Sequence, residues 1–545
     1  MNLRRKRLIK KGKIGTLVLC LFFFAFFLIH PALSPNLDQT THIAIAQCEL
    51  DILSKQSKFN FQRSTDHDLD FDIRIYQEDE AFDGYNLFVV DPARTDRGKC
   101  NNTLLITDMV GEIVLKRNVG YGTGTVFAEF INSTTILMGE PSGAVLWNIY
   151  SNKNHSINAK GHHEYEYNPL NNTIFTFNLY NIDIEGVSYR FDYINEYNLT
   201  GHLVWSLDTR SFISPTQWCP FQDMMGKDRG ITHSNTFFFD SEENIFYYNP
   251  RNLNTFYKID HKTSEVIWGL GQYGNFTLFD IEGNQRQNLF FHPHAIEKID
   301  DNKFILFDND KHNIDDPSST KSRIVELDIN ESTMTANESW IWVAPNSYYS
   351  HALGDADRLP NGNRLGTFGT SSHPDTDIGA RLVEVTNEGK IVWEMNFPKT
   401  ETYKYEVNRM ERIHFSPVVD FPPDINALPN EDITVTWHTW YNFRAKRKMN
   451  GSYSLFLDGN LVEEGGHIFE KFWRPTNLIF NLGKLNIGSY NLQLALEDEG
   501  GHVTTDEIVI TISQHESSTI PFDINGLLLG LIILMIWKTK RKKIG

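Results

Sequence analysis

Histidine recurs at matching places in the middle of the chain, and imidazole is well suited to catalysis near neutral pH. His163, His233, His294 and His351 each open a segment that runs through a polar turn into an apolar strand. A neutral imidazole can act as a nucleophile, a base or a metal ligand, and its ordinary pKa of about 6.5 allows proton transfer around neutrality. A single histidine is usually structural, but one that recurs at the same position of a repeated unit indicates a shared site.

The unit that carries these histidines recurs between about residues 83 and 415. Its second half is a tight polar turn followed by a short strand, usually with tryptophan, as at 107–116, 197–206, 260–269, 338–344 and 386–394. Self-similar units of this length are typical of β-propeller blades. The first strand of a blade lies nearest the axis, so the histidines should meet in the central channel. We therefore expect an all-β fold with a six-bladed β-propeller over 83–420.

The regions on either side of the repeat differ from it in composition. Residues 35–82 are polar and acidic, which favours a linker with an edge-covering strand. Residues 421–513 alternate apolar and polar positions between glycines, which predicts a small immunoglobulin-like β-sandwich.

Hydrophobic segments with basic flanks mark both ends of the chain. Residues 14–29 predict a signal peptide or an N-terminal membrane anchor within 1–34. Residues 520–537 predict a transmembrane helix within 514–545, which would end in a basic cytoplasmic tail. Because basic flanks stay in the cytoplasm, we expect a cell-membrane protein with one or two anchors and its body on the extracytoplasmic side.

Charge and cysteine content limit the partners of this body. The formal net charge of the chain is −18, and without the basic ends the body carries about −30. Such a body repels nucleic acid, whose binding depends on neutralising phosphates. One disulfide, such as Cys48–Cys100, is allowed, and N-x-S/T sites such as Asn198 fit an exported glycoprotein. A homodimer is one option for its assembly.

Three chemistries could use the histidines. The first is metal binding by His292 and His294 with Asp308 nearby, but no cysteine or acid cluster in the sequence completes that set, so we expect no metal. The second is acid–base catalysis on a sugar or lactone, which would require a marked pair of carboxylates. The third is nucleophilic transfer of an anionic group, with one histidine as nucleophile and other groups gripping the anion.

Five motifs, taken in order, favour the third chemistry. They are DGYNLFVVDP with NTLLITDMVGEIVLK, then THSNTFFFDSEENIFYYNP, FHPHAIEKIDDNKFILFDND, FGTSSHPD and YKYEVNRMER. Together, over about residues 84–415, they resemble the bacterial periplasmic arylsulfate sulfotransferases and their archaeal relatives.

The resemblance implies transfer of a sulfuryl group from an aryl sulfate to a phenol. His373 would be the nucleophile that becomes sulfo-histidine, and His233 and His294 would hold sulfuryl oxygens or move the phenolic proton. The family's arginine after Phe-Asp-Asn is replaced here by Lys311, and the next arginine is Arg323. The resemblance thus gives His373, His233, His294 and Arg323 as catalytic residues. It gives Lys311, His351, Asn235 and Asn309 as substrate-binding residues.

No cofactor is expected, because the sequence contains no phosphate-binding G-x-x-x-x-G-K-[ST] loop for a nucleotide sulfate donor. The runner-up hypothesis is a non-enzymatic cell-surface propeller that acts as a binding platform. A third is a hydrolase or lyase that uses metal-bound water.

Overall fold

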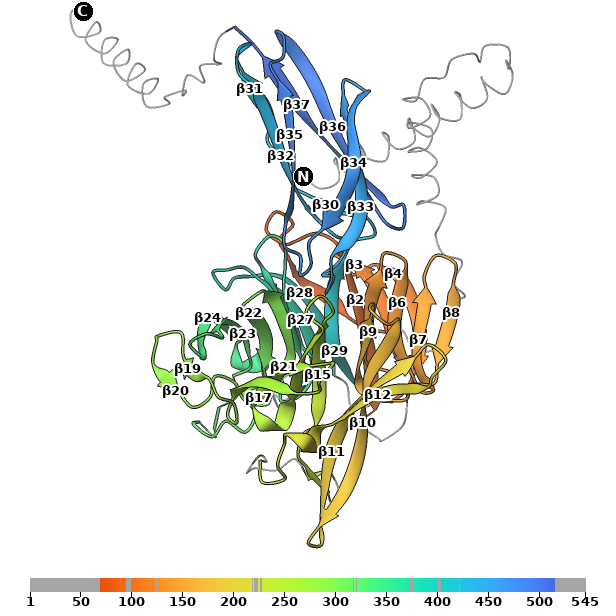
Figure 1. The fold of residues 1–545 in the computed structure, drawn as a ribbon, viewed down its shortest axis with the longest axis vertical. Helices are drawn as coiled ribbons and strands as arrows, with labels where there is room; N and C mark the ends of the chain where they lie inside the picture. Colours follow the sequence, from red (N-terminus) through yellow and green to blue (C-terminus); the bar gives the residue numbers. More distant parts are fainter. Residues whose placement is uncertain are drawn as a thin grey trace, which may run out of the picture. The chain divides into compact units, whose positions relative to one another are not determined.

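The computed structural model describes residues 69–514, apart from 95–99, 123–124, 218, 220–223, 226–227, 317, 320, 372–376, 400–402 and 421. All of these residues fall in the second of two compact units, Asp66–Gly545, and they form an all-β, propeller-like fold (Figure 1). Helix within them is confined to the 3-10 turns η2 (Thr209–Ser211), η3 (Arg251–Leu253) and η4 (Asn346–Tyr348). None of the described helices is long and apolar enough to span a membrane. The apolar segments 14–29 and 520–537 lie outside the described residues.

Six sheets, each built on four antiparallel strands, succeed one another along the first part of the described chain. The first sheet has the order β29 (Tyr403–Ile413), β2 (Tyr85–Arg94), β3 (Asn102–Asp108) and β4 (Ile113–Gly120). The second has β5 (Ala128–Asn132), β6 (Thr135–Glu140), β7 (Gly143–Asn148) and β8 (Lys153–Ile157). The third has β9 (His162–Asn168), β10 (Thr173–Ile184), β11 (Val187–Asn198) and β12 (Leu203–Asp208), with β14 (Asp228–Gly230) and β13 (Met224–Met225) added to β11.

The other three sheets repeat this order. The fourth has β15 (Ser234–Asp240), β16 (Ile245–Pro250), β17 (Thr255–Asp260) and β18 (Val266–Gly271). The fifth has β21 (His294–Asp300), β22 (Lys303–Asp308), β23 (Arg323–Asn330) and β24 (Thr335–Val343), followed by β19 (Thr277–Phe279) and β20 (Gln285–Arg286). The sixth has β25 (Asp355–Arg358), β26 (Arg364–Phe368), β27 (Ile378–Val385) and β28 (Ile391–Pro398), with β1 (Asp72–Tyr76) on its outer edge.

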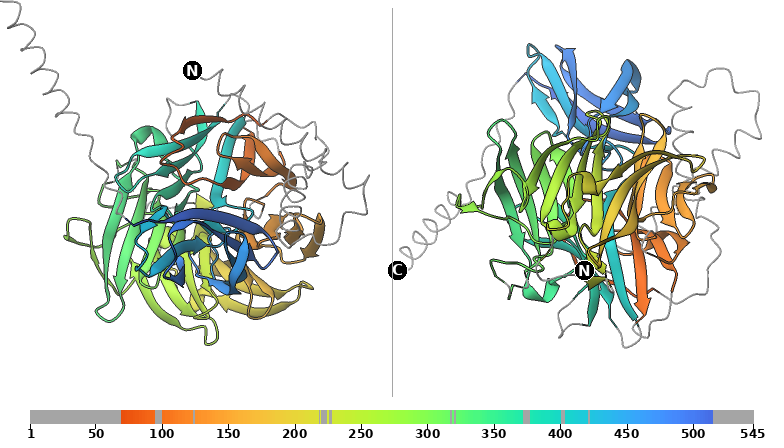
Figure 2. Two further views of the ribbon diagram at one scale, coloured as in Figure 1. Left: turned by 90° about the horizontal axis from the view of Figure 1, so that it is seen from above. Right: turned by 60° about the horizontal axis from the view of Figure 1, so that its bottom comes forward.

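The first strands of consecutive sheets lie beside one another, which determines where the histidines meet. Strand β9 contacts β15, β15 contacts β21, β21 contacts β25, and β25 contacts β29. Figure 2 shows the sheets following one another in chain order around a common centre. Because β29 pairs with β2, the end of this region joins its beginning within the first sheet.

Aromatic residues fill the space between neighbouring sheets, which explains why outer strands carry tryptophan. Trp268 of β18 is 3% exposed and packs against Tyr247, Phe256 and Phe304, the last of which belongs to the fifth sheet. A sheet of this kind cannot bury both faces alone, so stacking of neighbours supplies the core.

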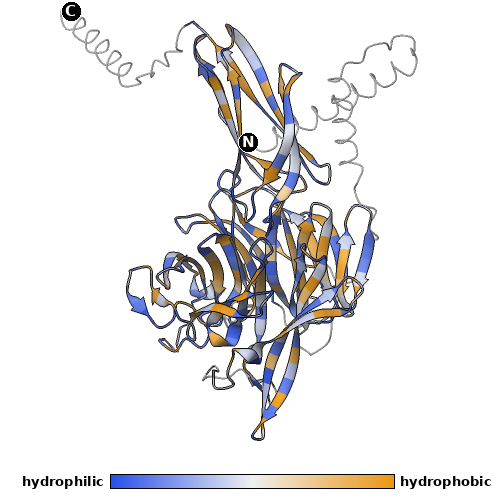
Figure 3. Cartoon of the chain, viewed as in Figure 1, coloured by the Kyte–Doolittle hydropathy of each residue, from blue (hydrophilic) through white to orange (hydrophobic). Residues whose placement is uncertain are grey.

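Two further sheets form the region after residue 417. One has β30 (Val418–Val419), β32 (Ile433–Trp440) and β35 (Thr476–Gly483). The other has β31 (Ile425–Ala427), β37 (Val503–Ile512), β36 (Gly488–Asp498), β33 (Met449–Leu457) and β34 (Asn460–Phe469). Hydropathy alternates along these strands (Figure 3), and apolar side chains of both sheets, such as Trp437 and Leu494, share one core.

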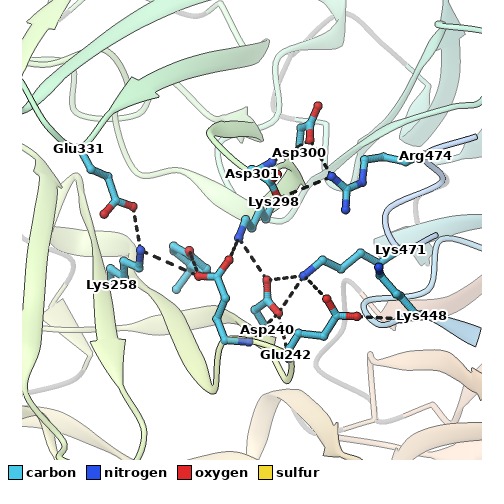
Figure 4. Close-up of polar contacts among 12 residues, drawn as sticks. Asp240, Glu242, Lys258, Lys298, Asp300, Asp301, Glu331, Lys448, Lys471 and Arg474 are labelled. Carbon is cyan, nitrogen blue, oxygen red and sulfur yellow. Dashed lines mark hydrogen bonds and ion pairs between the residues drawn. The ribbon is translucent and has the colours of Figure 1, made fainter.

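Buried ion pairs join this region to the fourth sheet. Lys471, which follows β34, donates hydrogen bonds to the carboxylate of Asp240 at the end of β15 (Figure 4). Lys298 of β21 donates to the same carboxylate at 3.1 Å. Asp240 is fully buried, so its two cationic partners offset the cost of removing a carboxylate from water.

Candidate active site

The structure brings together four histidines at or before the first strands of four consecutive sheets. His163 lies in β9, His233 directly precedes β15, His294 begins β21, and His351 lies shortly before β25. The rings of His163 and His233 meet edge to face with their centroids 5.8 Å apart. His163 also interacts electrostatically with His294. The repeat-based prediction that such residues converge therefore matches the geometry of the described residues.

Burial and nearby positive charges favour the neutral form of His163, His294 and His351, whose pKa values are all lowered. Burial, together with His162, His233, His294 and Arg251, lowers the pKa of His163 well below its ordinary value. Burial and the nearby Arg251 do the same to the pKa of His294. Burial, Lys311, Lys404 and Arg251 lower the pKa of His351 to about 4. A neutral imidazole has the lone pair that a nucleophile or a base needs.

A buried carboxylate holds the segments that carry the histidines of the third and fourth sheets. Asp192 lies 2.9 Å from Nε2 of His162, and Nδ1 of His162 lies 2.8 Å from Nδ1 of His163. The other oxygen of Asp192 accepts hydrogen bonds from the Thr232 hydroxyl and the Ser234 backbone N–H. His163 and His233 both have positive φ, 62° and 44°, which costs free energy for a non-glycine residue and is retained mostly at functional sites.

Two asparagines predicted to bind substrate hold the segment that carries His294. Asn309 donates through Nδ2 to the carbonyls of Ser350 and Leu353 at 2.7 and 2.9 Å, and its Oδ1 contacts Nδ1 of His294. Because an amide oxygen only accepts, Nδ1 carries the proton in this contact and Nε2 carries the lone pair. Asn235 donates to the carbonyl of Pro293 at 3.2 Å.

Arg251 is a central residue of the cluster that sequence reasoning missed. It lies in η3, is 2% exposed, and interacts electrostatically with His163, His294 and His351. Its Nη2 donates to the backbone carbonyl of His351 at 3.3 Å. A usable signal existed, because β15 and β16 pair Ser234 with Pro250 and so place His233 and Arg251 at the same end of one hairpin.

The other predicted residues with charged or catalytic roles are Arg323, Lys311 and His373. Arg323 is held by Asp308 at 2.7 Å, by Glu338 at 3.2 Å and by the Leu289 carbonyl at 2.6 Å, so its described contacts lie with these groups and not with the histidines. Lys311 interacts electrostatically with His351. His373 lies outside the described residues, and its predicted role stays a prediction.

A layer of carboxylates that the sequence did not reveal continues along the same first strands. Its members include Glu129 on β5, Glu166 on β9, Glu297 on β21, Asp357 on β25 and Glu411 on β29. Cations from residues 444–446 enter this layer: Arg444 pairs with Glu297 and Asp357, and Lys446 with Glu129 and Glu166. A cavity is lined by Glu129, Glu166, Glu411, Arg444 and Lys446, and none of the four histidines lines it.

Comparison with known families identifies this arrangement. A family model described as Arylsulfotransferase (ASST) matches residues 95–406, which is more than half of the chain and contains all four histidines. The chain belongs to the arylsulfotransferase family. This arylsulfotransferase is therefore a sulfotransferase-type transferase, and aryl sulfates and phenols are the substrates that its family implies.

No curated protein sequence shows significant similarity to the arylsulfotransferase chain. Among solved structures, the extracellular domain of a putative hybrid two-component system from B. thetaiotaomicron is 9% identical with a TM-score of 0.31, and the match covers 82% of this chain and 58% of that one. A hypothetical selenium-binding protein from Sulfolobus tokodaii is 9% identical with a TM-score of 0.32, and the match covers 80% and 92%. A CARDB domain from Pyrococcus furiosus is 14% identical with a TM-score of 0.15, and the match covers 17% and 87%. At these scores none of the three informs on function.

Proposed function

We propose that this arylsulfotransferase moves a sulfuryl group from an aryl sulfate to a phenol through a covalent sulfo-histidine, without a nucleotide sulfate donor. The observation that carries the proposal is the group of neutral imidazoles around the buried Arg251 guanidinium. Such a group offers nucleophiles and bases beside a fixed positive charge, which is what transfer of an anionic group needs.

In the first half-reaction, a nitrogen of His373 forms a bond to sulfur, and the bond from sulfur to the aryl oxygen breaks. The aryl oxygen leaves as a phenolate, which takes up a proton. In the second half-reaction the oxygen of the acceptor phenol attacks sulfur, the nitrogen–sulfur bond breaks, and the phenolic proton passes to a base. Ser371, two positions before His373, forms a β-bridge with Ser350, the neighbour of His351. This bridge supports an assignment of His373 to the same site.

We assign the remaining predicted residues, together with Arg251, roles that their contacts support. His233 and His294 hold sulfuryl oxygens or carry the phenolic proton. Arg251 supplies the fixed positive charge with Lys311, while Arg323 supports the site from behind Asp308. His351, Asn235 and Asn309 position the substrate and the strand starts around it.

We infer that the six sheets are the blades of one propeller and that residues 418–512 form an immunoglobulin-like sandwich. The consecutive sheet order and the neighbouring first strands support the first inference. We also assign the body to the extracytoplasmic side, held at the membrane through residues 14–29, 520–537 or both. Membership of the enzyme family does not favour the alternative of a non-enzymatic platform.

The test is a transfer assay with 4-nitrophenyl sulfate as donor and phenol as acceptor. The wild type should release nitrophenol and form phenyl sulfate, and His373→Ala should do neither. The exposed His155→Ala serves as the control and should match the wild type. After treatment with donor alone, mass spectrometry should find one sulfuryl group on the peptide that contains His373. Equal turnover by wild type and His373→Ala would exclude this nucleophile, and release of inorganic sulfate alone would indicate a hydrolase.

A further inference from the structure

A cysteine and two histidines from distant parts of the chain converge beside the candidate active site. Cys219 lies between η2 and β13, His292 precedes β21, and His312 follows β22. Their ligand atoms all lie within 4.8 Å of one another. Sγ of Cys219 is 3.3 Å from Nδ1 of His312, and the rings of His292 and His312 are perpendicular with centroids 4.7 Å apart.

We propose that Cys219, His292 and His312 bind one transition-metal ion of the zinc or copper type. One thiolate and two imidazoles form a ligand set that both ions accept. Two such ligands on a tetrahedral ion lie about 3.5 Å apart. Sγ of Cys219 and Nδ1 of His312 are already close to this spacing, and all three ligand atoms lie within 4.8 Å of one another. The sequence alone predicts no metal at His292 and His294, because no cysteine or acid cluster completes that set, but the fold supplies Cys219 from between η2 and β13 of the third sheet.

The surroundings favour a built site over a chance encounter of three polar groups. Cys219 is 6% exposed and His292 is fully buried, while His312 is half-buried and gives the site one open side. His292 and His312 both have positive φ, 51° and 58°. A positive φ costs free energy at a residue other than glycine, and a structure keeps it when the surrounding contacts require that backbone conformation. The backbone N–H of His292 is further held by Asn254 at 2.8 Å.

Three protein ligands leave a fourth position for water or another small ligand. The ion would also tie Cys219 to the residues on either side of β21 and β22 in the fifth sheet. His292 is followed by Pro293, whose carbonyl accepts hydrogen bonds from Asn235 and Asn249, and then by His294. The metal therefore fixes the segment that presents His294 to the histidine cluster, and it acts as a clamp rather than as a reactant.

The test uses the full-length protein, stripped with a chelator under reducing conditions and titrated with Zn2+ alone or Cu2+ alone. We expect one ion per chain and a rise in Tm on binding. Cys219→Ser should weaken the affinity by about 10²-fold or more and abolish the rise in Tm. Cys100→Ser, the matched cysteine control, should behave as the wild type. Bound Cu2+ should give a visible thiolate-to-copper absorption that Cys219→Ser loses.

His312→Gln provides a second variant if Cys219→Ser does not fold, because His312 is the least buried of the three. It should likewise lose stoichiometric binding. If the wild type binds neither ion stoichiometrically, or if wild type and variants bind alike, the contact between Cys219 and His312 is only a hydrogen bond and the proposal is wrong. The readouts are metal content, absorption and Tm, so this proposal and the sulfuryl-transfer proposal can fail independently.

Discussion

Arg409 of β29 forms a two-pronged ion pair with Glu164 of β9, which links the first sheet to the third. Nη1 of Arg409 lies 3.0 Å from one oxygen of Glu164, and its Nη2 also donates to the Thr236 hydroxyl on β15. Burial raises the pKa of Glu164 to about 7, although Arg409 and Lys446 oppose this. Arg409 also interacts electrostatically with His294 and with Glu129 of the carboxylate layer, so the pair should matter for stability and for the charge of the site.

Replacing Arg409 with methionine should destabilise the fold by about 3–5 kcal/mol, because the change leaves the fully buried Glu164 without its main counter-ion. Urea denaturation followed by tryptophan fluorescence measures this loss. The control is Arg74→Met, which breaks the exposed pair with Asp72 and should cost less than about 1 kcal/mol. Equal losses for the two variants would contradict a structural role of the buried pair.

Arg251→Lys should lower kcat/KM for 4-nitrophenyl sulfate by about 10²-fold or more. Lysine keeps the charge but loses the planar fork, and it cannot reproduce the hydrogen bond to the His351 carbonyl. Steady-state kinetics on the folded fraction measures the change. Arg323→Lys is the comparison: it should lower Tm through its pairs with Asp308 and Glu338 and leave kcat/KM within a few-fold of wild type. The reverse pattern would return the catalytic role to Arg323.

The low pKa of His351, about 4, predicts a dependence of stability on acid pH. Below about pH 6.5 the His351 imidazole binds a proton in the unfolded chain, whereas in the folded chain it stays neutral until the pH is near 4. The free energy of unfolding should therefore fall as the pH drops from about 6.5 toward about 4. His351→Gln removes this contribution, and its Tm should therefore decline less over that interval. The exposed His155→Gln is the control and should follow the wild type. Parallel curves for His351→Gln and wild type would show that His351 titrates normally.

The sequence predicted the histidine cluster because the signal was local and periodic. His163, His233, His294 and His351 lie at or just before the start of the same kind of hairpin, so a repeat alone is enough to align them. The repeat alone does not predict that Arg251 belongs to the cluster. That prediction also needs the register of the β15–β16 hairpin, in which Ser234 pairs with Pro250.

Other parts of the site depend on contacts that no local pattern encodes. Cys219 meets His312 across 93 positions of the chain, and Lys446 meets Glu129 across 317. The carboxylates of the layer lie within strands, and nothing in the sequence marks them as a group. Each is one acidic residue among many in the sequence. Their convergence depends on first strands that lie side by side and on ion pairs with Arg444 and Lys446, which are far from them in the chain.

Glu411 of the carboxylate layer should make stability depend on pH in the opposite direction to His351. Burial, Asp355 and Glu129 raise the pKa of Glu411 to about 8, while Lys446 and Arg409 oppose the rise. The folded state thus favours the protonated acid, and the stability that this provides is complete below pH 4.5 and is lost as the pH rises through about 8.

Glu411→Gln keeps the shape and the neutral form of this side chain at every pH. Its free energy of unfolding should equal that of the wild type near pH 5 and exceed it by a few kcal/mol near pH 9. Urea denaturation at pH 5, 7 and 9 measures the difference, with the exposed Glu265→Gln as the matched control. If the gain at pH 9 were absent, the cations Lys446 and Arg409 would already hold Glu411 ionised, and the layer would consist of paired charges and not of shared protons.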